Sequence, residues 1–200
     1  MKANYYPERK LLLKFLKGRI LDVGCNYGDF HKFVIERGRE VSGEVYGLDI
    51  EVTNYKDNMV KGDAHFLPFK DESFDSVFAG EIIEHLTNPA QFLKEVERVL
   101  KRGGVAVLTL PNPYSLTLLY LKDKLFGKSI TYSPSESFGH VYAWDISLLH
   151  SLIKRVTNLV VKEFGYTEKE GEISFGILGR ILHKIFPEFI SGLIYLCLKK

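Results

Sequence analysis

Residues 81–86, Glu-Ile-Ile-Glu-His-Leu, place two carboxylates and an imidazole close together in the sequence. If a helical turn begins at Glu81, then Glu81, Glu84 and His85 share one face, because residues three and four apart are neighbours on a helix. Carboxylate and imidazole groups in such a set are candidate ligands for a divalent ion such as Mg²⁺ or Mn²⁺. Glu81 and His85 are also candidate general bases.

A glycine turn earlier in the chain indicates a binding site of a different kind. Residues 20–28, Ile-Leu-Asp-Val-Gly-Cys-Asn-Tyr-Gly, predict a buried strand followed by a tight turn between Gly24 and Gly28. Glycine lets the backbone approach a ligand, and a helix expected at 29–37, capped by Asp29, would offer free N–H groups at its start. Asn26 replaces the middle glycine of the dinucleotide-binding motif, so this turn is poorly suited to bind a pyrophosphate.

Two further predicted strands end in carboxylates. Asp49 closes the apolar run at 45–50, 25 residues after Gly24, where nucleotide-binding α/β folds place an acid that accepts hydrogen bonds from ribose hydroxyls. Asp63 closes the run at 59–63. Each residue alone could be an ordinary polar strand end, but the order of the motifs favours a cofactor site.

The motifs I-L-D-V-G-C-x-x-G, G-L-D-I, G-D-A-x-x-L-P-F, F-D-x-V, E-H-L and L-K-x-G-G follow one another within residues 10–112. This order resembles the class I S-adenosylmethionine (SAM)-dependent methyltransferases, type 11-like, a group related to quinone-biosynthesis methyltransferases. The resemblance implies SAM as cofactor, with Asp49 on the ribose, Asp63 on the adenine amino group, and Asp22 with the glycine turn at the methionine end. The cofactor-binding residues expected in this way are Asp22, Gly24, Cys25, Asn26, Gly28, Asp49, Ile50, Asp63, Ala64 and Glu81.

The resemblance also bears on residues 81–85. The E-x-x-E-H pattern is similar to the metal-binding segment of quinone O-methyltransferases and of RNA 3′-end 2′-O-methyltransferases. His140, in Phe-Gly-His-Val-Tyr, occupies the place where relatives carry a histidine at the substrate mouth, so it joins Glu81 and His85 as a candidate catalytic residue and could complete the metal site. Metal-free relatives also carry an E-H pair here, which leaves the metal-free alternative open.

Apolar runs at 19–23, 45–50, 59–63, 74–79 and 104–110 alternate with predicted helices at 29–37 and 89–101. This alternation predicts an α/β fold with a doubly wound, mostly parallel sheet. Asn88-Pro89 marks a helix start, and Lys101-Arg102-Gly103-Gly104 is expected to end that helix. Further helices are predicted at 8–17 and 145–156. By resemblance, 159–166 and 192–198 complete a seven-stranded Rossmann-like sheet with an antiparallel edge strand.

The 200 residues are expected to form a single methyltransferase domain, 1–200, with insertions at about 112–140 and 168–190. Lys plus Arg number 27 and Asp plus Glu 25, a near-balance that disfavours nucleic acid as partner. Two distant cysteines offer no disulfide framework. The first residues lack the apolar core of a signal peptide, and no apolar run approaches the roughly 20 residues of a membrane span, so we expect a cytoplasmic protein.

The expected reaction is methyl transfer to a small-molecule or lipid-like acceptor, at oxygen. RNA 2′-O-methylation and a catalytically silent SAM-binding partner subunit are the alternatives. An apolar stripe within 176–187, flanked by basic residues, is expected either to pack on the sheet edge or to join Leu118–Phe126 as a lid that makes peripheral contact with a membrane.

Overall fold

The protein is represented by a computed structural model that describes residues 6–25, 30–52, 58–114, 117, 139–167, 184–186, 188 and 193–200. Both predicted insertions, at 112–140 and 168–190, fall largely outside this part of the chain, as does the proposed lid at 118–126 and most of 176–187. In the described part, no helix combines the length and apolarity needed to cross a membrane.

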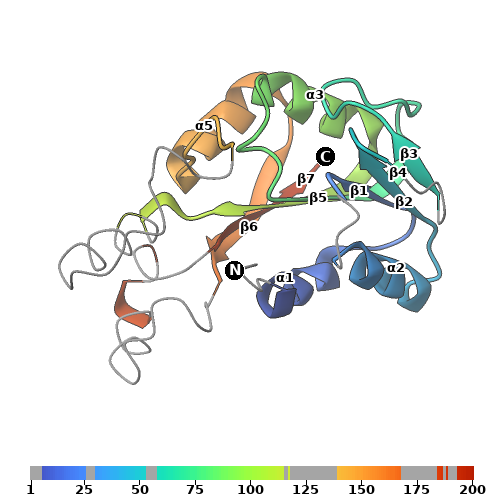
Figure 1. The fold of residues 1–200 in the computed structure, drawn as a ribbon, viewed down its shortest axis with the longest axis horizontal. Coiled ribbons are helices and arrows are strands. Elements are labelled where there is room, and N and C mark those ends of the chain that lie inside the picture. Colours follow the sequence, from blue (N-terminus) through green and yellow to red (C-terminus); the bar gives the residue numbers. More distant parts are fainter. Residues whose placement is uncertain are drawn as a thin grey trace.

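Seven strands of the described residues form one sheet in the order β3-β2-β1-β4-β5-β7-β6 (Figure 1). The strands are β1 Ile20–Val23, β2 Val45–Asp49, β3 Met59–Lys61, β4 Phe74–Gly80, β5 Leu100–Pro111, β6 Val160–Tyr166 and β7 Leu193–Lys199. The pairs from β3 through to β5 are parallel, whereas β7 runs antiparallel to β5 and to the outermost strand β6. This topology confirms the predicted α/β class and its mostly parallel, Rossmann-like sheet.

Helices cover both faces of the sheet. Helices α1 (Tyr6–Leu12) and α2 (His31–Glu40), with the short 3₁₀ helix η1 (Leu13–Phe15), lie on one face, and α3 (Pro89–Val99) and α5 (Ile146–Val156) lie on the other (Figure 1). Each layer has its own core. The α3/α5 layer buries Phe92, Leu93, Val96, Leu149 and Ile153 completely, and the opposite layer buries Leu16, Phe30 and Val34 against Phe78.

The start of α3 agrees with its sequence signal, but its end does not. The Asn88 side chain accepts a hydrogen bond from the Gln91 backbone N–H at 3.1 Å, and proline occupies the first turn. The helix ends at Val99, however, and Leu100 already pairs with Phe74 as part of β5. Burial of the Leu100 side chain within the sheet outweighs the helix-ending signal of residues 101–104, which lie in the strand.

Other boundaries differ from expectation by a few residues. Helix α2 begins at His31 and continues to Glu40, beyond the predicted end at residue 37, while the predicted cap Asp29 lies outside the described residues. The helix predicted at 8–17 is divided into α1 and η1. Helix α5 begins at Ile146, one residue after the predicted start, because the Asp145 side chain caps it by accepting a hydrogen bond from the Leu148 N–H at 2.9 Å.

Candidate functional site

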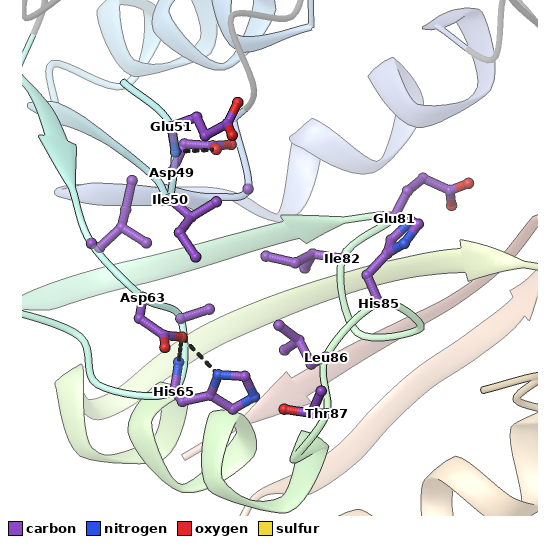
Figure 2. A pocket seen from close by; sticks show the side chains of 14 residues that line it. Asp49, Ile50, Glu51, Asp63, His65, Glu81, Ile82, His85, Leu86 and Thr87 are labelled. Carbon is purple, nitrogen blue, oxygen red and sulfur yellow. Dashed lines mark hydrogen bonds and ion pairs between the residues drawn. The ribbon is translucent and has the colours of Figure 1, made fainter. Parts of the chain in front are cut away.

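The strand order reverses direction between β1 and β4, which are neighbours in the sheet although β2 and β3 lie between them in the sequence. In open α/β sheets the carboxyl ends of the strands at such a point form a ligand-binding crevice. A pocket of about 640 Å³ lies there, within the usual range for small-molecule sites. It is lined by Gly24, residues 48–51, residues 62–65 and five side chains between 81 and 87 (Figure 2).

Asp49 and Asp63 line the same pocket (Figure 2), and each lies at the carboxyl end of its predicted strand. Asp49 is the last residue of β2, and its Oδ1 accepts a hydrogen bond from the Glu51 backbone N–H at 3.1 Å. Asp63 follows β3, and its Oδ1 accepts from the His65 backbone N–H at 2.8 Å. That backbone bond is the main reason why the pKa of Asp63 lies below its usual value. The pocket therefore presents two ordered carboxyl groups.

His65 also contributes to this arrangement, although it was not among the site residues expected from the sequence. Its Nδ1 lies 2.7 Å from Asp63 Oδ1, and its Nε2 accepts a hydrogen bond from the Asn88 backbone N–H at 3.1 Å. Because Nε2 is an acceptor, the ring proton belongs on Nδ1, where it is donated to Asp63. The only sequence signal was the position of His65 two residues after Asp63.

Gly24 is required by its backbone conformation and by its surroundings. Its φ of 73° lies in the left-handed region, and a Cβ at this position would lie 2.7 Å from Ile82 Cδ1. Absence of a side chain thus lets the turn after β1 pack closely against residues 81–87. Cys25 is buried, with its Sγ 3.8 Å from Met59 Sδ, and is not among the pocket-lining residues. Asn26 and Gly28 lie outside the described residues.

Asp22 takes part in a buried pair that sequence reasoning did not anticipate. Its side chain is 4% exposed, and its Oδ2 lies 2.7 Å from His31 Nδ1 on α2. Burial raises the pKa of Asp22, although the hydrogen bond and charge of His31 and the charge of Arg9 oppose the rise. Asp22 is not among the residues that line the pocket, and its contact with the methionine end of a cofactor, direct or through water, stays a prediction.

Residues 81–87 form turns and bends, not the predicted helical turn. Glu81 has a φ of 57°, which is incompatible with a right-handed helix, and the His85 N–H donates to the Ile82 carbonyl at 2.9 Å. Glu81 and His85 line the pocket, and Glu81 Oε2 lies 3.7 Å from a guanidinium nitrogen of Arg9. The side chain of Glu84 does not line the pocket and is buried in the protein.

The structure brings Glu84 and His85 together with His140 in place of Glu81. One potential ligand atom from each of the three side chains lies within 4.8 Å of the other two. His140 Nε2 is 4.0 Å from Glu84 Oε1, and the two imidazole centres are 4.6 Å apart. Burial, followed by the negative charge of Glu81, raises the pKa of Glu84 well above its usual value. Burial, followed by the nearby His85, lowers the pKa of His140.

The chemistry of the pocket fits a nucleoside-bearing cofactor. Carboxylates at the ends of two neighbouring strands suit hydroxyl and amino donors, and Gly24 removes the side chain that would fill the turn. Apolar surface for an aromatic base comes from Leu48, Ile50, Ala64, Ile82 and Leu86.

Comparison with known proteins agrees with this geometry. Residues 21–108 match the family described as "Methyltransferase domain". A demethylmenaquinone methyltransferase from Staphylococcus aureus is 36% identical over 134 residues, covering 56% of this chain and 55% of that protein. The chain spans about half the length of the curated relatives it matches.

Two solved structures share the fold at low sequence identity. An S-adenosylmethionine-dependent methyltransferase from Mesorhizobium loti has a TM-score of 0.64 at 16% identity, with 99% of this chain and 98% of that chain covered. The Haloferax volcanii complex between the Trm112 methyltransferase activator and a methyltransferase has a TM-score of 0.66 at 17% identity, with 100% and 90% covered.

Proposed function

We propose that the protein transfers a methyl group from SAM to a small-molecule or lipid-like acceptor, at oxygen, on the premise that residues 21–108 match the methyltransferase-domain family. One observation carries the proposal. The pocket at the β1/β4 switch point combines a glycine turn with carboxylates at the ends of β2 and β3. These are the groups that a nucleoside cofactor with a charged amino acid end requires.

Within this proposal Asp49 accepts hydrogen bonds from the ribose hydroxyls, and Asp63, held by His65, accepts one from the adenine amino group. Ile50 and Ala64 pack against the base. Gly24, Cys25, Asn26 and Gly28 hold the methionine end, and Glu81 completes the site. Asp22 acts at the methionine end directly or through water, and its pair with His31 fixes the start of α2 relative to β1.

SAM supplies a methyl group already activated by a sulfonium, so the protein has mainly to align the acceptor and exclude water. An oxygen acceptor must also lose a proton. His85 lines the pocket and, when neutral, can accept that proton, while Glu81 lines the same wall and is held near Arg9. His140, whose pKa is lowered by burial, lies beside His85 as a third candidate.

A transfer assay with labelled SAM tests the reaction and the acceptor class together. Purified protein is incubated with lipid, small-molecule and RNA fractions of a cell extract, and label is followed in each fraction. We expect label in the small-molecule or lipid fraction, in keeping with a relative named for demethylmenaquinone. Label confined to RNA would contradict this proposal and favour 2′-O-methylation.

A second candidate is a SAM-binding subunit that acts only with a protein partner. It is favoured by the fold shared with a methyltransferase that is held in complex with the Trm112 activator. The discriminating measurement is methyl transfer by the purified chain alone and after addition of proteins that co-purify with it. Turnover by the chain alone would exclude the silent-subunit alternative.

Peripheral membrane contact stays a prediction from the sequence, since the stripe at 176–187 lies mostly outside the described residues. Co-sedimentation with anionic vesicles is the test, with Ile181→Asp as the variant that breaks the stripe. Wild-type protein that stays in the supernatant at low salt would exclude the membrane contact and leave a soluble acceptor.

A further inference from the structure

His65 connects two separate segments of the pocket wall. It lies in the loop after β3, and its Nε2 accepts a hydrogen bond at 3.1 Å from the backbone N–H of Asn88, the residue that caps α3. Its Nδ1 lies 2.7 Å from Asp63 Oδ1 (Figure 2). Thr87, next to Asn88, lines the pocket as Asp63 and His65 do. The imidazole therefore joins the strand end at β3 to the start of α3.

These two contacts select a single protonation state of the imidazole. Nε2 faces a backbone N–H and is therefore unprotonated, so Nδ1 carries the ring proton that Asp63 accepts. The opposite tautomer would direct a lone pair at the carboxylate, and an imidazolium would direct its Nε2–H at the Asn88 N–H. Because both nitrogens are engaged and the side chain is only 15% exposed, the orientation of the ring is fixed.

The contacts of His65 determine which oxygen of Asp63 a ligand can reach. Oδ1 accepts two hydrogen bonds from His65, one from the backbone N–H at 2.8 Å and one from Nδ1. Among the described residues none donates to Oδ2, and the Asp63 side chain lines the pocket with 47% of its surface exposed. The backbone hydrogen bond, with the side-chain one after it, lowers the pKa of Asp63 against the opposing effect of burial. At neutral pH the group is therefore an ionised acceptor.

We propose that His65 is a specificity-determining residue, which makes the pocket select a purine with an amino group at position 6 over one with a carbonyl oxygen there. It acts through Asp63, which it holds with one oxygen left for a ligand. An amino group donates a hydrogen bond to that oxygen, whereas a 6-carbonyl group presents a second acceptor and is repelled. The inference rests on the proposed use of SAM, and it adds to the assignment of Asp63 the residue that sets its selectivity.

Asp63 alone would be less selective. Without the imidazole its half-exposed side chain keeps one local hydrogen bond, from the backbone N–H of residue 65. A carboxylate released in this way can turn either oxygen to the ligand, or bind a water molecule that bridges it to a 6-carbonyl group. Loss of the His65 side chain should thus lower the affinity for adenine more than the affinity for hypoxanthine.

The test compares two ligands that differ in the substituent at position 6 of the purine. S-adenosylhomocysteine, the demethylated product of SAM, carries an amino group there, and S-inosylhomocysteine carries a carbonyl oxygen. Calorimetry gives the ratio of their dissociation constants for each variant. A hydrogen bond to a charged group makes that ratio roughly 10 to 100 in the wild type, and His65→Ala should lower it by roughly 3- to 10-fold.

Two further variants isolate the hydrogen bond that Nδ1 donates. His65→Asn retains an N–H group near the position of Nδ1 but has no acceptor at the position of Nε2, so its ratio should stay close to that of the wild type. His65→Phe fills the space of the imidazole without a donor and should lower the ratio as His65→Ala does. Disturbance of the loop alone would lower the ratio in His65→Asn as well.

His150→Ala, at an exposed position on α5, is the matched control and should bind both ligands as the wild type does. Circular dichroism establishes that each variant is folded. Equal affinity of the wild type for the two ligands, an unchanged ratio in folded His65→Ala or His65→Phe, or a ratio that His65→Asn lowers equally, overturns the role of His65 and leaves the proposed function intact. Wild-type protein that binds neither ligand contradicts the proposed function and this inference together.

Discussion

Replacing Asp49 by alanine is the most direct way to test the assigned cofactor orientation. The carboxylate ends β2, is partly exposed to the pocket, and is positioned in advance because its Oδ1 accepts a hydrogen bond from the Glu51 N–H at 3.1 Å. Hydrogen bonds to a charged group contribute about 1.5–3 kcal/mol, so loss of the ribose contact should weaken SAM binding roughly 10- to 100-fold. Asp49→Asn retains an acceptor oxygen but loses the charge, and should fall between wild type and Asp49→Ala.

Isothermal titration calorimetry with SAM, and separately with its demethylated product, measures this loss. Glu40→Ala is the matched control, because it removes a carboxylate from the exposed end of α2, where Glu40 pairs with Arg37 at the surface. That control should bind SAM with wild-type affinity. If folded Asp49→Ala also binds with wild-type affinity, Asp49 does not contact the ribose and the orientation of the cofactor must be reassigned.

Three other predictions concern stability, its pH dependence and metal. Gly24→Ala should lower the free energy of unfolding by about 1–2 kcal/mol, because the new Cβ is strained in the left-handed conformation and collides with Ile82 Cδ1. Denaturant titration measures this loss, and unchanged stability would contradict the close packing of this turn. Burial raises the pKa of Asp75, but the Arg19 N–H and the Lys101 ammonium together bring it below its usual value. The ionised Asp75 therefore stabilises the folded state above about pH 4, and this contribution is lost as pH falls through the pKa of Asp75 in the folded protein. Asp75→Asn should accordingly reduce the fall in the free energy of unfolding between neutral and acid pH. If the metal site predicted from the sequence operates, methyl transfer should cease with excess chelator and return with Mg²⁺ or Mn²⁺, and undiminished turnover would separate the metal from catalysis.

The sheet could be predicted from sequence because buried parallel strands are continuous apolar runs. The run at 74–79 corresponds to β4, whose side chains from Ser76 to Ala79 are buried. Residues 100–104 show the limit of this reasoning. Two basic residues and two glycines are typical of a helix end, yet here they begin a strand, since pairing of Leu100 with Phe74 is a contact that no local pattern records.

The cofactor pocket was predictable to the extent that it depends on strand ends. Asp49 and Asp63 each close an apolar run, and the parallel topology brings those ends to one edge of the sheet. His65 and His31 were missed as partners of Asp63 and Asp22 for a different reason. Histidine alone carries no positional signal, and the buried Asp22–His31 pair joins a strand to a helix across a turn whose path the sequence does not specify.

Residues 81–85 show most clearly why spacing alone did not predict which side chains lie together. The i, i+3, i+4 spacing would place Glu81, Glu84 and His85 on one face only if the segment were helical, and the positive φ of Glu81 excludes that conformation. The turn directs Glu81 and His85 to the pocket and buries Glu84, whose carbonyl then binds the segment that carries His140. Because these main-chain contacts bring together residues far apart in sequence, the position of His140 beside Glu84 and His85 depends on the fold and not on the local motif. The wall of the pocket formed by residues 81–87 is therefore held from outside the pocket by a second part of the chain, residues 140–142, whose backbone bonds to Glu84. Substitutions at His140 should therefore affect this wall although His140 does not line the pocket.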